Sequence, residues 1–236
     1  MKKYKKKRVK KYNKFFSYKN ADRAKRNFSY KDFGYSESYN TKFTGSLFYG
    51  NNFYRATMKY CGFNGCTFRF IEFKSVNFKG SRFKGAIFEN VLFDNCKLEK
   101  ADFHGAVFRN VYCVNTGLKK TRGISSLEKI VQFNGKVSEF DFGEKLIKAI
   151  LYCEKNKYIM KSDTIYKCNA KTGDTVKMIN RVNIIRLLDA YSEDEIVNGL
   201  HLAADSIDKS FNSLSYFLPY IRKAQENIEG SNKDEG

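Results

Sequence analysis

The histidines are the first residues to consider for chemistry, because imidazole is the side chain that most often moves protons near neutral pH. The chain has two, His104 and His201. His104 follows Asp102 by two residues on an expected exterior surface, and the sequence places no nucleophile beside this pair. His201 lies in an expected helix among apolar residues, which is typical of a partly buried helix position. We therefore predict that neither histidine is a catalytic base.

Other motifs that carry chemistry are missing from the sequence. It has no phosphate-binding loop, no GxGxxG and no HExxH, and its Asp and Glu residues are scattered. None of the six cysteines forms a CxxC pair, so with two histidines the zinc-ligand pattern is also missing. The cysteines are Cys61, Cys66, Cys96, Cys113, Cys153 and Cys168. The sequence thus predicts a protein that is not an enzyme and holds no metal ion or cofactor.

Positive charge is the feature that most clearly suggests a partner. The formal net charge is +19, and residues 1–40 hold 14 Lys and Arg against 3 Asp and Glu. Residues 41–118 hold 11 against 5, and residues 119–236 hold 19 against 17. A basic arm attracts polyanions by counterion release, which predicts contact with a nucleic acid or nucleoprotein; a tail that only aids solubility is the alternative. The arm residues expected to make the contact are Lys5, Lys6, Lys7, Arg8, Lys10 and Lys11.

The sequence shows no targeting signal. It has no apolar run of about 18 residues, which argues against a membrane span. The basic N-terminus is not followed by the apolar stretch of a secretory signal. We therefore expect a cytoplasmic protein with reduced thiols and no membrane partner.

A period of five residues runs through the middle of the chain. From Phe43 to Leu118 every fifth residue is apolar, and twelve of these sixteen centres are Phe. Two residues before each centre the side chain is nearly always small. This period fits neither an α-helix, at about 3.6 residues per turn, nor a flat strand, and it predicts a chain that turns a corner after every five residues. Four such sides close one coil, so residues 20 apart stack, and a column of glycines at 45, 65, 85 and 105 suits tight corners.

The pattern resembles the pentapeptide-repeat family, whose consensus is Ala-(Asp/Asn)-Leu-x-x. The clearest match is Ala101-Asp102-Phe103-His104-Gly105, and the resemblance covers about a third of the chain, with Phe in place of Leu at most centres. It implies a right-handed, four-sided β-solenoid, with about four coils over residues 41–122. Cys61, Cys66, Cys96 and Cys113 then fill the interior as packing residues. Some members look like duplex DNA and bind type II topoisomerases, but such mimicry needs an acidic surface, and the charge of these repeats is +6.

The outward positions of the repeats give two candidate surfaces. One face carries a lysine row that could follow a phosphate backbone or could be a solvated face; it includes Lys59 and is interrupted by Glu99. Its candidate nucleic-acid-binding residues are Lys79, Lys97, Lys100, Lys119 and Lys120. The second surface is an apolar strip, which usually marks an interface with either the C-terminal domain or a second copy of the chain. Its candidate interface residues are Leu47, Tyr49, Ile87, Val107, Leu92 and Tyr112.

The remaining chain predicts three further parts. Residues 1–40 form the basic arm and an irregular cap, in which Ser38 breaks the five-residue phase; residues 123–230 form a mainly helical domain, and residues 231–236 a disordered tail. Helices are expected near 126–132, 143–155, 180–190 and 208–227, the last kinked or split at Pro219. Ser192 and Glu195 form a capping box that opens another helix to about residue 205. Residues 157–178 are expected to form a hairpin.

These features together predict a non-catalytic binding or scaffold protein of bacterial or phage origin. The rigid solenoid and the basic arm would contact a nucleic-acid or nucleoprotein partner, and a protein partner or a homodimer is also possible. One alternative is a topoisomerase-binding DNA mimic, which the basic charge disfavours. Another is a structural subunit of a multi-protein assembly, such as an antiphage defence complex.

Overall fold

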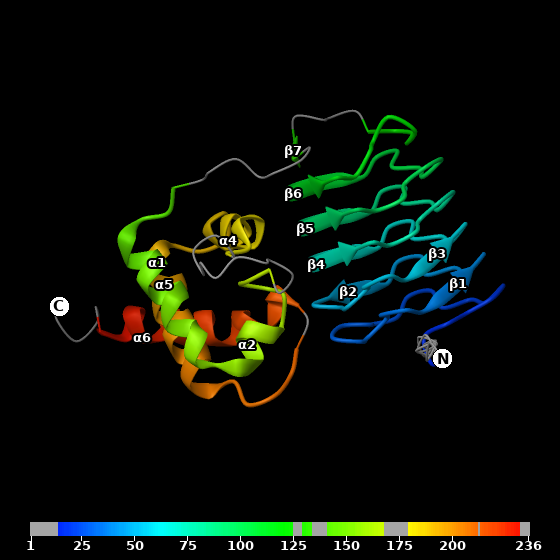
Figure 1. The fold of residues 1–236 in the computed structure, drawn as a ribbon. Coiled ribbons are helices and arrows are strands. Elements are labelled where there is room, and N and C mark those ends of the chain that lie inside the picture. Colours follow the sequence, from blue (N-terminus) through cyan, green and yellow to red (C-terminus); the bar gives the residue numbers. More distant parts are fainter. Residues whose placement is uncertain (1–13, 125–128, 134–140, 168–178, 212, 232–236) are drawn as a thin grey trace, which may run out of the picture.

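The computed structural model describes residues 14–124, 129–133, 141–167, 179–211 and 213–231. It shows a rod of stacked coils with a cluster of helices against one side (Figure 1). The predicted fold class, a β-solenoid followed by a small helical C-terminal region, is confirmed, with about five turns instead of the predicted four. Within the described part of the chain, no helix is long and apolar enough to cross a bilayer.

The corners of the coil come from a left-handed backbone torsion at every fifth residue. From Asn20 to Asn115, each corner residue has a φ between 46° and 71°. At many corners the carbonyl of the centre closes the turn, as where the Ser46 amide donates to the Phe43 carbonyl at 3.1 Å. A positive φ at the third turn residue with this hydrogen bond is the geometry of a type II turn. The predicted glycine column supplies some corners, but Asn and several larger residues occupy the others.

Successive coils pair as parallel strands with a register of 20 residues, or 19 residues where β7 joins β6. The strands are β1 (Glu37–Tyr39), β2 (Leu47–Tyr49), β3 (Thr57–Lys59), β4 (Thr67–Lys74), β5 (Ile87–Asp94), β6 (Val107–Val114) and β7 (Ile130–Phe133). β1 pairs with β3 on one side of the rod, and β2-β4-β5-β6-β7 form a second sheet (Figure 1). Phe48, Phe68 and Phe88 are partners in consecutive strands, as the repeat predicts.

The solenoid begins earlier than expected, so the interpretation of residues 21–40 as an irregular cap was wrong. Lys19 bridges Tyr39 and Asp22 bridges Lys42, both in parallel, which makes these residues a regular coil. Ser38 occupies a centre and is 1% exposed. The hydroxyl of this polar residue accepts from the Tyr18 amide at 3.3 Å, so the coil continues through it.

The core is a set of phenylalanine ladders. In one ladder the rings of Phe43, Phe63, Phe83 and Phe103 stack with centroids 4.9–5.1 Å apart and planes within 8° of parallel. Offset stacking of this kind adds to the free energy gained by burying the rings. Each ring therefore supports its neighbours one coil above and one coil below.

The small inward positions also make long-range hydrogen bonds. Cys66 donates to the Phe43 carbonyl and Cys96 to the Phe73 carbonyl, each 23 residues earlier and at 3.0 Å. Asn51, which the consensus would not favour, donates to the Phe28 carbonyl at 2.5 Å in the same way. Burial raises the pKa of Cys61, Cys66 and Cys113 to about 12, so these thiols stay protonated and serve packing.

The helical domain contains α1 (Glu144–Tyr152), η2 (Cys153–Lys155), α2 (Lys157–Lys161), α4 (Arg181–Leu188), α5 (Glu193–Ser206), η3 (Leu214–Phe217) and α6 (Leu218–Ser231). The expected helices at 143–155 and 180–190 are present, and the Ser192–Glu195 capping box opens α5 as predicted. The last helix starts later than expected, because Pro219 lies in the first turn of α6, where its missing amide costs no hydrogen bond.

One expectation on this region was wrong, and the predicted hairpin is confirmed only where an antiparallel bridge joins its two arms. Where a helix was expected near residues 126–132, the chain instead adds β7 to the free edge of β6, because Ile130 pairs with Val111. Where the predicted hairpin begins, residues 157–161 are helical, with Asn156 capping α2. An antiparallel bridge joins Tyr166 to Ile179, and residues 168–178 lie outside the described residues.

The ladders predict a large cost for removing one ring. Phe68 is fully buried between Phe48 and Phe88, so Phe68→Ala should lower the free energy of unfolding by about 3–5 kcal/mol, measured by denaturant titration. Phe15 is 80% exposed, and Phe15→Ala is the matched control, with an expected change of about 0.5 kcal/mol or less. Similar small losses in both variants would contradict a continuous ring core.

Candidate functional site

The helical domain docks on one corner of the solenoid, between the side that carries Tyr49 and the side that carries Glu72 (Figure 1). Phe70 occupies this corner, is 6% exposed and belongs to the apolar core of the helices, 6.4 Å from the ring of Tyr191. Beside it, Arg222 of α6 donates to the Tyr49 hydroxyl at 3.1 Å. The docked corner is therefore an extension of the helical core and not a loose contact.

A buried ion pair joins the two parts at this corner. Arg186 of α4 and Glu72 of β4 lie 3.2 Å apart, and their side chains are 0% and 3% exposed. Arg186 also donates to the Asn90 carbonyl at 2.8 Å and to the Asn183 amide oxygen at 2.8 Å. Glu72 accepts from the Leu214 amide at 3.0 Å. A buried charge pair is tolerated only with such extra hydrogen bonds, and this one has partners on both sides of the junction.

Lys74 extends the network toward the surface. Its ammonium lies 3.1 Å from Glu72 and 3.6 Å from the Asp163 carboxylate. Burial alone would raise the pKa of Glu72, but the charges of Lys74 and Arg186 outweigh burial and hold that pKa below its ordinary value. For Lys74, burial would lower the pKa, and the two carboxylates raise it instead. Glu72 and Lys74 therefore stay charged at neutral pH.

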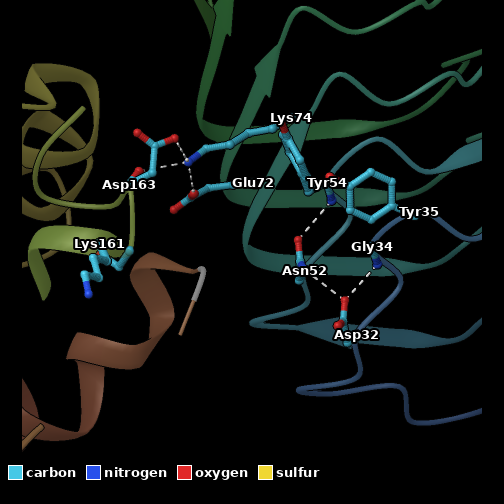
Figure 2. A pocket seen from close by; sticks show the side chains of 10 residues that line it. Asp32, Gly34, Tyr35, Asn52, Tyr54, Glu72, Lys74, Lys161 and Asp163 are labelled. Atoms are coloured by element: carbon cyan, nitrogen blue, oxygen red, sulfur yellow. Dashed lines mark hydrogen bonds and ion pairs between the residues drawn. The ribbon is translucent and has the colours of Figure 1, made fainter. Parts of the chain in front are cut away.

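A pocket of about 470 Å³ opens beside this network, between the solenoid and α2 (Figure 2). The lining residues are Asp32, Gly34, Tyr35, Asn52, Tyr54, Glu72, Lys74, Lys161, Ser162 and Asp163. Asp32 accepts from the Gly34 amide at 2.8 Å and from Asn52 at 2.9 Å, which fixes the solenoid wall. The lining has three carboxylates against two lysines and contains no histidine or cysteine, so it offers a polar recess without a nucleophile–base pair.

The predicted apolar strip is divided by the docked domain. Leu92 and Tyr112 are 3% and 1% exposed, because Val182 of α4 packs on them. Tyr49 packs against the helical core. Leu47 and Ile87 are half-buried, and Val107 is 40% exposed on a column that the helices leave open.

The predicted lysines lie on a different side of the rod. We call this side, formed by residues 37–39, 57–59, 77–79, 97–99 and 117–119, the lysine face; β1 and β3 belong to it, and Figure 1 shows them away from the helices. Lys97, Lys100, Lys119 and Lys120 are exposed, and Lys79 is half-buried. The six arm residues proposed for the same role lie outside the described residues.

The next side around the coil is also basic. This adjacent face aligns Lys42, Arg82 and Arg122 in one column through bridges between successive coils. Asp102 lies in the same column and contacts Lys84 at 3.6 Å and Arg122 at 3.9 Å. The carboxylate lies one coil from Arg82 and one coil from Arg122, and therefore reduces the repulsion between these cations.

The two histidines occupy different settings. His104 lies 2.6 Å from Asp102 with its side chain 63% exposed, on the exterior as predicted. Burial would raise the pKa of Asp102, but hydrogen bonds from His104 and the charge of Lys84 lower it instead. His201 is exposed and stacks on Tyr152 at 4.5 Å, so the expectation that it is partly buried was wrong; this side of α5 faces solvent beside α1.

Sequence reasoning did not identify the buried network. Glu72 stands at an outward repeat position, where a charged side chain normally meets water, and Arg186 lies among apolar residues of α4. The two are 114 residues apart, so no local spacing links them. The only available signal was an arginine within the apolar pattern of a predicted helix.

Comparisons with known proteins agree with the architecture. The family model for pentapeptide repeats matches residues 71–116, in 8 copies. No curated protein matches the chain. Three solved structures are similar in fold: a pentapeptide repeat protein of the Arabidopsis thaliana thylakoid lumen, the plasmid-mediated fluoroquinolone resistance protein QnrB1, and the pentapeptide repeat protein Rfr23 of the cyanobacterium Cyanothece 51142.

These structures are distant from the chain. The Arabidopsis protein is 21% identical over 40% of this chain and 69% of its own, with a TM-score of 0.25. QnrB1 is 14% identical over 44% and 72%, with a TM-score of 0.33. Rfr23 is 11% identical over 49% and 90%, with a TM-score of 0.25. None of these similarities assigns a function.

The buried ion pair predicts a strong effect of one arginine. Arg186→Met leaves Glu72 buried with fewer partners, and the free energy of unfolding should fall by about 3–5 kcal/mol in denaturant titration. Arg69→Met is the matched control, because Arg69 and Glu89 form a 2.9 Å pair that is 46% and 32% exposed. Its expected loss is about 1 kcal/mol or less. A small loss for Arg186→Met would show that the docking does not depend on this pair.

The lowered pKa of Glu72 predicts a pH dependence. Its stabilising contribution is present above the ordinary glutamate pKa of about 4.3 and is lost as pH falls through the lower folded-state value. The stability difference between wild type and Glu72→Gln should therefore shrink on acidification from about pH 7 to about pH 3, measured by denaturant titration at each pH. Glu89→Gln is the half-exposed control, with a difference that stays small. A constant difference for Glu72→Gln would contradict the lowered pKa.

Proposed function

We propose that this pentapeptide-repeat protein is a non-catalytic binding protein whose basic solenoid faces contact a nucleic acid or nucleoprotein. The observation that carries the proposal is the position of the helical domain. It covers one corner of the rod and leaves the lysine face and the adjacent face exposed at the diagonally opposite corner. The positive charge of these two faces is thus free to meet a partner.

The charges on these two faces favour a polyanion. The outward Lys and Arg residues of the two faces and their shared corner are Lys19, Lys42, Lys59, Lys79, Arg82, Lys84, Lys97, Lys100, Lys119, Lys120 and Arg122. The carboxylates among them are Glu37, Glu99, Asp22 and Asp102. Each lysine contact with a phosphate releases counterions, and a rigid sheet holds the cations in place before binding. The same balance disfavours the topoisomerase-binding DNA mimic, which needs an acidic surface.

The N-terminal arm adds a second attachment to this proposal. Lys5, Lys6, Lys7, Arg8, Lys10 and Lys11 precede the first coil. That coil contains Lys19, which begins the lysine column, the column of the lysine face that continues through Tyr39 and Lys59. A bacterial or phage origin and a cytoplasmic location belong to the same proposal. The five cysteines in the described residues are free and buried, which suits a reducing compartment.

A structural subunit of a larger assembly is the second candidate. It is favoured by the column of Leu47, Ile87 and Val107, which the helical domain leaves half-exposed or exposed. An apolar column on a flat sheet can bind a protein partner or a second copy of the chain. Size measurement of the pure protein separates these partners, because only a second copy changes its mass.

The lysine face predicts a specific salt dependence. Substituting Lys97, Lys100, Lys119 and Lys120 with Gln should weaken nucleic-acid binding in fluorescence anisotropy and lower the slope of log affinity against log salt by up to about 3. The control substitutes the exposed Lys157, Lys161, Lys209 and Lys223 of the helical domain, which removes the same charge elsewhere. The arm is intact in both variants. Equal effects in the two would contradict binding by the lysine face.

A further inference from the structure

Two exposed tyrosines interrupt the basic surface. Tyr39 and Tyr60 are 47% and 42% exposed, and their rings lie 5.5 Å apart at 71°. Both lie at or beside the corner between the lysine face and the adjacent face, diagonally opposite the docked helices. Aromatic rings exposed as a pair on a face that none of the described elements covers are available for a partner.

Tyr39 lies within the lysine column. Lys19 bridges Tyr39 from the coil before, and Tyr39 pairs with Lys59 in the coil after. Parallel strands lie about 4.8 Å apart, so Tyr39 has a lysine one strand away on each side. A recess of about 260 Å³ beside it is lined by Tyr18, Lys19, Glu37, Ser38, Tyr39, Thr57 and Lys59.

Tyr60 lies along the corner because the next residue in its column is Gly80. A Cβ added to Gly80 would meet the Tyr60 ring at 2.5 Å, so the ring occupies the space of the missing side chain. The two following corner residues are Lys100 and Lys120, both exposed. The corner thus presents an aromatic ring first and cationic groups beyond it.

We propose that this corner binds single-stranded nucleic acid, with bases stacked on Tyr39 and Tyr60 and phosphates contacting the flanking lysines. The inference rests on the proposed function and narrows its partner. A duplex keeps its base faces inside the stack. Its phosphates can therefore contact the lysines, but its bases cannot stack on the tyrosine rings. An unpaired base offers its face to an exposed aromatic ring, and such stacking tolerates any base. The partner is therefore a single strand of mixed sequence.

The test compares a labelled single strand of about 12 nucleotides with the duplex of the same sequence, using the full chain in fluorescence anisotropy. Substituting both tyrosines, Tyr39→Leu with Tyr60→Leu, should lower single-strand affinity by about tenfold or more and leave duplex affinity and the salt slope unchanged. Tyr39→Phe with Tyr60→Phe keeps the rings and should retain wild-type affinity.

The matched control is Tyr30→Leu with Tyr54→Leu, which removes two other exposed rings, 65% and 36% exposed, on the side of the docked helices. This variant should bind as wild type does. Photocrosslinking of wild type to a strand containing 5-iodouracil gives a readout that needs no variant, and it should label Tyr39 or Tyr60. Crosslinks only elsewhere would overturn the inference.

The outcomes separate this inference from the proposed function. The Tyr39→Leu with Tyr60→Leu variant could lower single-strand and duplex affinity equally, or lower neither, while the lysine variant still weakens binding. In that case the inference of base stacking is wrong and the proposed function stands. If wild type binds neither nucleic acid, the proposed function fails and the stacking surface fails with it.

Discussion

The left-handed torsion at every fifth residue is the constraint on which the solenoid depends. Glycine adopts this torsion readily, but Phe70, Tyr60 and Arg55 also adopt it, at a steric cost that L side chains normally avoid. The parallel hydrogen bonds and stacked rings of neighbouring coils offset that cost, since each corner is held by the coils on both sides. Changing the period would misalign the ladders, the small-residue hydrogen bonds and the outward columns together.

Fold and site differ in how far the sequence could predict them. The period of five identifies the buried centres, because inward and outward positions repeat along one short stretch of chain. The period does not predict that Ser38 is a buried centre, because its hydroxyl accepts a hydrogen bond from a residue 20 positions earlier. Nor does it predict β7, which pairs with a sheet edge that exists only in the folded rod. The Glu72–Arg186 pair was not predictable, because its energetics depend on burial at a junction of distant segments. The outward positions of the lysines on the free faces can be predicted from the five-residue repeat alone.

The charged residues fall into two groups, one buried at the docked corner and one exposed on the free faces. Glu72 and Arg186 are buried and paired with each other across the junction, so they fix how the helical domain sits on the rod. The lysines of the free faces stack one coil apart in water, where solvent and interleaved carboxylates such as Asp102 moderate their repulsion. Like charges in register do not stabilise a sheet, so their accumulation on two neighbouring faces is more consistent with binding than with folding.

The docking network also limits where the rod can gain or lose a whole coil. Glu72, Asn90 and Tyr112 lie in three successive coils, and each contacts the helical domain. Gain or loss of a 20-residue unit among them would shift these contacts out of register with α4. The earlier coil also takes part, because its Asp32 and Tyr35 line the pocket together with Lys161 and Asp163 of the helical domain. The docked domain therefore fixes the number and order of the coils that it spans.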